Sequence, residues 1–157
     1  HKNHISLLNK VMKKIIILIQ ILIFSLPSLA KENFNLKKII NLNNPWSLTF
    51  VNEREALISE KEGEILLVNI NNGSKQKVKH NLNFKVDGQG GLLEIIKHKD
   101  HVYMCYTEDR GSGKTSTSIA RASFSKTNLN FKNIFQANPP INSGYHFGCR
   151  MVIQDDQ

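Results

Sequence analysis

Short apolar runs that alternate with tight polar turns are the feature that most restricts the fold of this chain. From residue 46 to residue 135 the large apolar side chains repeat with a period of two, as in half-buried strands. No stretch after residue 30 shows the longer period, about 3.6 residues, of an amphipathic helix. The pair Asn72-Gly73 is the strongest hairpin signal in the chain. The pattern predicts an all-β fold.

The strands are expected to form two successive antiparallel units. The first is predicted to contain strands at residues 37–42, 46–51, 56–59 and 64–69. The second opens at residues 86–96 and continues with strands at 102–107, 116–124 and 131–135. Units that recur at about 40–50 residues are typical of β-propeller blades. Because a closed ring needs at least about four blades, residues 31–157 are expected to be two to three N-terminal blades of a longer propeller.

The first thirty residues have the order of parts found in a secretory signal peptide. Met12 is followed by two lysines, an apolar run at residues 15–24, and Ser28 and Ala30 at the expected cleavage site. The apolar run is too short to span a membrane comfortably. Residues 12–30 are therefore predicted to be a signal peptide and residues 1–11 an upstream extension. The mature protein is expected in the periplasm, without a stable membrane span after cleavage.

The formal net charge of +8 could suit nucleic acid or a membrane surface. Four lysines and no acidic residue precede the expected cleavage site, so the remainder carries +4. Its lysines are scattered singly or in pairs, whereas a nucleic-acid interface gathers them in a stripe. The charge pattern indicates a solvated surface and argues against nucleic acid as a partner.

Cys105 and Cys149 both lie inside apolar, strand-like runs. A buried free cysteine behaves there as a small hydrophobic residue. Export would place both in an oxidising compartment, where they could pair. The sequence context favours two free, buried cysteines, with a disulfide as the alternative.

Two polar residues flanked by glycines are the candidate site residues. His146 lies between Gly144 and Gly148, and Gln89 lies directly after Gly88. Each precedes an apolar run at an equivalent place in successive units, so a propeller could bring them together at its channel. A histidine in a cleft can act as a general base, and a glutamine amide can bond a sugar hydroxyl. Both could instead be ordinary turn residues that cap a strand. No metal site is predicted.

Four motifs carry a resemblance to a known family. They occur in order at residues 44–50 (NPWSLTF), 57–65 (LISEKEGEI), 88–93 (GQGGLL) and 143–150 (SGYHFGCR). Together they resemble the N-terminal part of the glucose/sorbosone dehydrogenase family, the soluble quinoprotein aldose sugar dehydrogenases. The resemblance implies a six-bladed propeller in the periplasm that uses pyrroloquinoline quinone (PQQ) and calcium.

The resemblance also implies roles for single residues. His146 matches the catalytic base, which takes the proton of the anomeric hydroxyl while hydride passes to the quinone, and the aldose becomes a lactone. Gln89 matches a glutamine that lines the same site. Tyr145 occupies a substrate- or cofactor-facing position that is usually Asn or Asp, and Cys149 replaces a common Gly or Ser.

The remaining expectations concern parts outside this chain. The quinone-binding cations and calcium ligands are expected beyond Gln157, so the chain alone is expected to be inactive. A periplasmic electron acceptor would complete the reaction. The alternative function is a non-catalytic periplasmic propeller that binds a carbohydrate or a protein partner.

Overall fold

The computed structural model describes residues 12–16 and 34–154 of the chain. The chain divides into two compact units, residues 1–37 and 38–157. Residues 12–16 form a single short helical turn, and no helix within the described ranges is long and apolar enough to cross a membrane. The predicted upstream extension and most of the predicted signal peptide lie outside the described residues.

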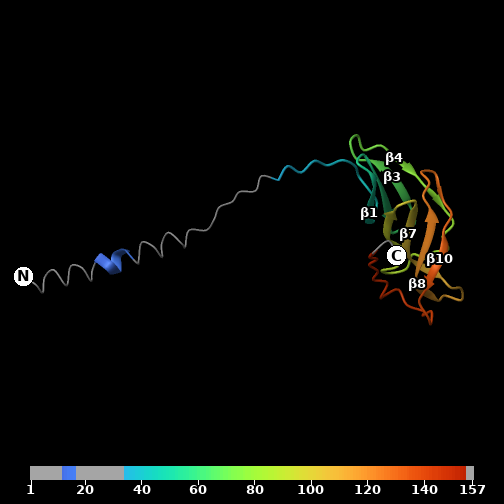
Figure 1. Cartoon of the computed structure of the whole chain (residues 1–157). Helices are drawn as coiled ribbons and strands as arrows, with labels where there is room; N and C mark the ends of the chain where they lie inside the picture. The colour runs from blue at the N-terminus through green and yellow to red at the C-terminus, as the bar shows by residue number, and fades with distance from the viewer. Residues whose placement is uncertain (1–11, 17–33, 155–157) are drawn as a thin grey trace, which may run out of the picture. The chain divides into compact units, whose positions relative to one another are not determined.

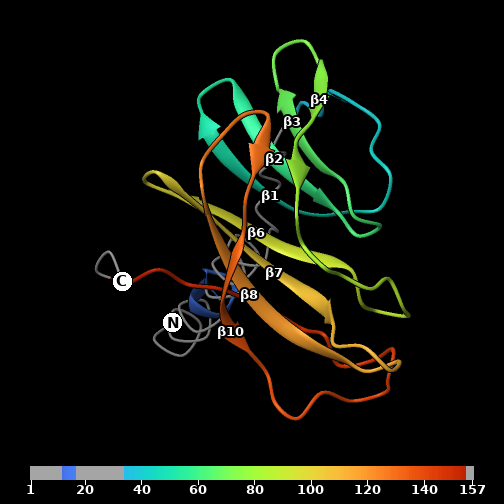
Figure 2. The same cartoon turned by 90° about the vertical axis from the view of Figure 1, so that its right-hand side faces the viewer.

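The second unit consists of β-strands, as the alternating pattern predicts. Sheet 1 has the strand order β1-β2-β3-β4 and sheet 2 the order β10-β8-β7-β6, and neighbouring strands in both are antiparallel. Figures 1 and 2 show the two sheets. The short strands β5 and β9 pair in parallel. The strands are β1 (Pro45–Asn52), β2 (Glu55–Glu60), β3 (Ile65–Asn69), β4 (Lys75–Lys77), β5 (Lys79–His80), β6 (Leu92–His98), β7 (His101–Asp109), β8 (Thr115–Ser123), β9 (Asn128–Leu129) and β10 (Lys132–Gln136).

One predicted strand is wrong. Residues 37–42 are not a strand, and the fourth place in sheet 1 is taken by β4, which follows the Asn72-Gly73 turn. Gly73 has a φ of 73°, as a tight hairpin turn requires. Ile40 and Leu42 instead pack against one face of sheet 1, beside Ile58. Their apolar side chains are used for packing, while the edge position goes to the strand that the hairpin delivers.

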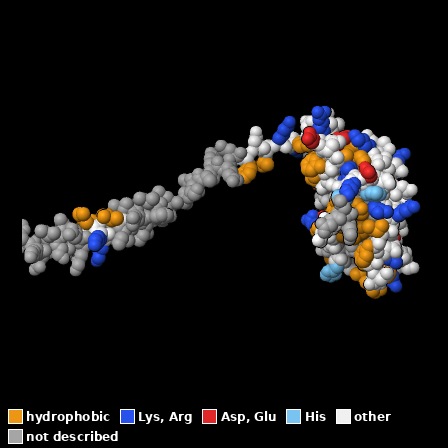
Figure 3. Space-filling view, in the orientation of Figure 1, with side chains coloured by type: hydrophobic (Ala, Val, Ile, Leu, Met, Phe, Trp, Pro, Cys, Tyr) orange, Lys and Arg blue, Asp and Glu red, His pale blue; other side chains and the backbone are white. Residues whose placement is uncertain are grey.

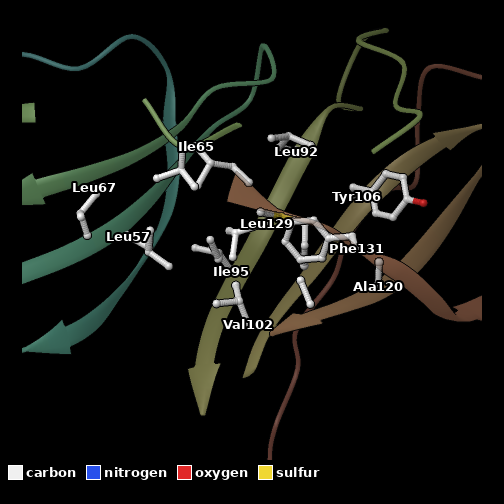
Figure 4. Close-up of a cluster of buried hydrophobic side chains, with 13 residues drawn as sticks. Leu57, Ile65, Leu67, Leu92, Ile95, Val102, Tyr106, Ala120, Leu129 and Phe131 are labelled. Carbon is white, nitrogen blue, oxygen red and sulfur yellow. The ribbon is translucent and has the colours of Figure 1, made fainter. Parts of the chain in front are cut away.

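The core lies between the two sheets. Its thirteen buried side chains come from both sheets and from the segments that join them, and Figure 4 shows how they meet. Val102, Leu92 and Leu57 are all 0% exposed. The alternation of strand side chains sends one face of each sheet into this cluster. The cluster consists of Leu57, Ile65, Leu67, Val78, Leu92, Ile95, Val102, Met104, Tyr106, Ala120, Ala122, Leu129 and Phe131.

The opposite face of β1 is more exposed than its alternating pattern suggests. Trp46, Leu48 and Phe50 are 47%, 55% and 59% exposed. Leu48 pairs with Ile58 across the strands, on the face turned away from the core residue Leu57. Figure 3 shows hydrophobic side chains on the surface of this unit. The β1 row is therefore an uncovered apolar strip, and Trp46 is not a core residue.

Tyr106 connects the core to a buried polar network. Its side chain is part of the core cluster, and its hydroxyl donates to Asn133 Oδ1 at 2.7 Å. Burial, together with the nearby charge of Glu108, raises the pKa of Tyr106 to about 12. The folded state therefore keeps the phenol protonated at pH values where an unfolded chain would release the proton.

This shift predicts alkaline sensitivity. Because the folded pKa is above the unfolded value near 10, the stabilisation is complete below about pH 10 and is lost as the pH rises towards 12, by an amount on the order of 1–3 kcal/mol. Tyr106→Phe should be less stable than the wild type at pH 7, by about 1 kcal/mol for the lost hydrogen bond. The difference should shrink or reverse by pH 12 in urea unfolding followed by circular dichroism. Parallel pH profiles for the two proteins would contradict this assignment.

Candidate functional site

The turn of residues 88–91 lies where three parts of the fold meet. Gly88 has a φ of 52°, and a Cβ there would lie 2.3 Å from the carbonyl oxygen of Gly144. Gly91 has a φ of 149°, and a Cβ there would lie 2.1 Å from the carbonyl oxygen of Lys61 in the turn after β2. Gly91 N also donates to Thr107 Oγ1 on β7 at 3.2 Å. Only glycine permits these close approaches, so the turn ties sheet 1, sheet 2 and the chain around residue 144 together.

Gln89 and His146, two of the three predicted site residues, lie in contact. Gln89 N donates to the Gly144 carbonyl at 2.8 Å, and His146 N donates to Gln89 Oε1 at 3.1 Å. These residues are 57 positions apart in the sequence, so the fold creates the contact. The carbonyl end of the Gln89 side chain therefore binds protein backbone.

His146 is exposed and its backbone has a φ of 70°. A positive φ is uncommon for residues other than glycine and occurs mostly where the surroundings hold it. Among the residues that the structure describes, the His146 imidazole has no hydrogen-bond partner. An imidazole of this kind can accept a proton from a bound hydroxyl without first breaking an internal bond.

Tyr145, the third predicted site residue, is 63% exposed. Its backbone N donates to Ser143 Oγ at 3.1 Å, which forms a local turn before His146. Tyr145 precedes the candidate base in the sequence, and its phenol lies on the surface. Its hydroxyl is available to a ligand or to solvent.

The cysteine interpretation favoured by the sequence context is wrong. Cys105 and Cys149 form a disulfide with an S–S distance of 2.04 Å. Cys105 lies on β7 with its side chain on the face opposite the core, and Phe147 packs there with Leu93. The segment 143–151 crosses this face without forming a strand, which brings the two Cα atoms to 6.5 Å. The apolar residues around each cysteine in the sequence are the same for a buried thiol and for a buried disulfide, so the sequence context could not distinguish the two.

Glu94 binds the far end of the same segment. Its side chain is 6% exposed and accepts from Arg150 Nη1 at 2.7 Å. The backbone N of Met151 also donates to this carboxylate. The segment 143–151 is thus attached on both sides of His146: to Gln89 before it, and to Leu93, Glu94 and Cys105 after it.

Lys61 is a neighbour that the sequence did not identify. Its Nζ donates to the Gly88 carbonyl at 2.5 Å, which places an ammonium group beside the turn that carries Gln89. In sequence it is one residue of a polar turn, and nothing there distinguishes it from the other lysines. Its position follows only from the packing of sheet 1 on sheet 2.

Metal binding finds no support within residues 12–16 and 34–154. No group of three or more His, Cys, Asp or Glu side chains in those ranges could hold a metal ion. The described residues therefore offer no cluster of carboxylates for a calcium ion.

Comparison with known proteins agrees with the fold and the motifs. A family model described as "Glucose / Sorbosone dehydrogenase" matches residues 42–157. The aldose sugar dehydrogenase YliI of Escherichia coli K12 is 27% identical over 121 residues, which cover 71% of this chain and 33% of that protein.

Two solved structures show the same arrangement of strands. The soluble aldose sugar dehydrogenase of Escherichia coli, in its apo form, matches with a TM-score of 0.69 and 25% identity, over 75% of this chain and 37% of that one. The PQQ-bound aldose sugar dehydrogenase of Streptomyces coelicolor matches in fold with a TM-score of 0.58 and 22% identity, over 66% of this chain and 34% of that one. The chain spans about a third of the length of these relatives and matches part of the propeller-fold sugar dehydrogenases. This chain belongs to the glucose/sorbosone dehydrogenase family.

Proposed function

We propose that this chain supplies the base-bearing part of a periplasmic, PQQ-dependent aldose dehydrogenase. The observation that carries the proposal is the contact between His146 N and Gln89 Oε1 at 3.1 Å. It brings together two residues that are 57 positions apart in the sequence, and the imidazole side of the contact is exposed. That arrangement fits a general base that must reach a bound sugar.

The residues of this chain have distinct parts in the proposed reaction. His146 accepts the proton of the anomeric hydroxyl through its imidazole. Gln89 holds the backbone of His146 through Oε1 and offers its Nε2 amide to a sugar hydroxyl. Tyr145, which is 63% exposed and next to His146 in the sequence, offers a phenol that can bond the substrate or the cofactor.

The described residues fit one side of a PQQ site. PQQ, when bound, accepts the hydride from the anomeric carbon and carries negative carboxylates. Lys61 supplies a cation within 2.5 Å of the Gly88 carbonyl, next to Gln89, which suits an anionic group at that end. The several carboxylates of PQQ need more cationic partners than one ammonium group. The remaining cationic contacts are proposed to come from other parts of the complete protein. The chain by itself is expected to be inactive.

Two observations support export to the periplasm. The sequence of residues 12–30 follows the order of a signal peptide. The Cys105–Cys149 disulfide fits an oxidising compartment, since disulfides are rare in proteins kept in the cytosol. A periplasmic electron acceptor would then reoxidise the cofactor.

The test uses the complete gene product that contains this chain, loaded with PQQ and calcium. Dye reduction should appear with at least one aldose, depend on added PQQ, and yield the corresponding lactone. If no aldose in a broad panel reduces the dye, the dehydrogenase proposal fails. Tight sugar binding that needs no PQQ would then favour a non-catalytic, carbohydrate-binding propeller.

A further inference from the structure

The position of His146 depends on its backbone, because its imidazole has no hydrogen-bond partner within residues 34–154. The segment 143–151 contains no strand, so no sheet ladder fixes that backbone. Before His146, the segment is held by two hydrogen bonds, from Gln89 N to the Gly144 carbonyl at 2.8 Å and from Thr115 Oγ1 to the Ser143 carbonyl at 3.4 Å. At His146 itself, the backbone N donates to Gln89 Oε1 at 3.1 Å. After it, the first covalent attachment to the sheet is the disulfide at Cys149.

The partner of that disulfide lies on a rigid strand. Cys105 is 0% exposed and lies on β7, which pairs with β6 on one side and β8 on the other. Only three peptide units separate His146 from Cys149, so the Cα of His146 stays within about 10 Å of that of Cys149, which the disulfide holds 6.5 Å from the Cα of Cys105. A tether of this kind limits the conformations that a detached segment can reach.

The first noncovalent contact after His146 is the packing of Phe147, and it restricts the backbone less than the disulfide does. Phe147 is 3% exposed and packs with Leu93 and Cys105. It is followed by Gly148, where an added Cβ would meet nothing within 4 Å. A glycine in open space gives the chain conformational freedom between Phe147 and Cys149. Packing of one phenyl ring can therefore open locally. The open segment then stays near the sheet through the disulfide at Cys149, the first attachment after Phe147, and through the Glu94 bonds to Arg150 and Met151 N further along.

We propose that Cys149, through its disulfide with Cys105, is a positioning residue for His146. The inference rests on the proposed function, because it assigns the disulfide to the placement of the base. Cys149 touches neither substrate nor cofactor in this role. It keeps the left-handed backbone at His146, with a φ of 70°, in place by anchoring the chain three residues later.

The first test is amide hydrogen exchange, followed by NMR on the 157-residue chain. Cys149→Ala removes the tether and leaves the Cys105 thiol in its buried position, so β7 gains no cavity. We expect exchange at the amides of His146 and Gln89 to rise about tenfold or more, while the β7–β8 ladder changes much less. Unchanged exchange at these two amides, or an equal rise at every amide, would overturn the proposal.

Val152→Ala is the matched control for this test. It changes a residue three positions after Cys149 and keeps the disulfide, and Val152 is 83% exposed. Truncating an exposed side chain usually changes stability little, so exchange at His146 should stay within about twofold of the wild type. A rise as large as that in Cys149→Ala would show that any change near Cys149 releases His146, which would overturn the role of the disulfide.

The second test separates this inference from the proposed function. In the complete gene product, Cys149→Ala should lower kcat by about 10-fold to 100-fold, as misplacement of a reacting group does, and leave KM within about twofold. An active wild type with an unchanged kcat in Cys149→Ala would overturn the inference alone. A wild type without dehydrogenase activity would defeat the proposed function, and hydrogen exchange would then decide by itself whether the disulfide holds His146.

Discussion

Replacing His146 by alanine in the complete gene product should lower kcat by roughly 10²–10⁴-fold, the usual effect of losing a general base. The imidazole is exposed and makes no hydrogen bond with any residue in the described ranges, so its removal should not disturb the fold. The backbone bond from His146 N to Gln89 Oε1 does not need the imidazole. The measurement is dye reduction with a saturating aldose, together with the urea midpoint of each protein.

His101→Ala is the matched control for the His146 variant. His101 begins β7, at the end of sheet 2 opposite the 88–91 turn, so its loss should leave kcat within about twofold. Equal turnover in the wild type and His146→Ala would remove His146 from the mechanism. A large fall in the urea midpoint of His146→Ala would instead indicate a structural role for its side chain.

The parts of the fold that local pattern determines were predictable from the sequence. Seven of the eight predicted strands overlap strands of the structure, because alternating side chains and glycine turns act over a few residues. The failure was residues 37–42. Their apolar side chains could serve a strand or pack against a sheet, and in the structure Ile40 and Leu42 pack against Ile58, Leu66 and Val68. Which of the two they do depends on contacts between distant residues.

The candidate site was likewise predictable only in part. Glycines beside Gln89 and His146 mark places where backbones approach closely, and the structure brings those two residues together. Lys61 and the Cys105–Cys149 disulfide were not identified, because each depends on which faces of the two sheets meet. The catalytic roles of His146, Gln89 and Tyr145 remain proposals that the kinetic tests address.

Replacing Glu108 by alanine should lower the free energy of unfolding by about 2–4 kcal/mol, because hydrogen bonds to a charged acceptor are stronger than neutral ones. Glu108 is 9% exposed and accepts from three side chains on two other strands, Ser118 at 2.7 Å, Asn133 at 2.8 Å and Gln136 at 2.7 Å. Without the carboxylate, the buried Ser118 hydroxyl loses its acceptor, while Asn133 and Gln136 are exposed and can turn to water. Urea unfolding at pH 7 measures the change.

Two further variants separate the network from the effect of charge alone. Glu108→Gln keeps the shape and one acceptor oxygen but turns an amide donor towards the other donors, so its loss should be smaller, about 1–3 kcal/mol. Glu64→Ala removes a carboxylate whose ion pair with Lys77 is exposed, with side chains 40% and 75% accessible, and should cost about 0–1 kcal/mol. Glu108→Gln should also bring the pKa of Tyr106 closer to its usual value, since the charge of Glu108 is one cause of the shift. If Glu108→Ala were no less stable than Glu64→Ala, the buried network would contribute nothing measurable to the stability of sheet 2.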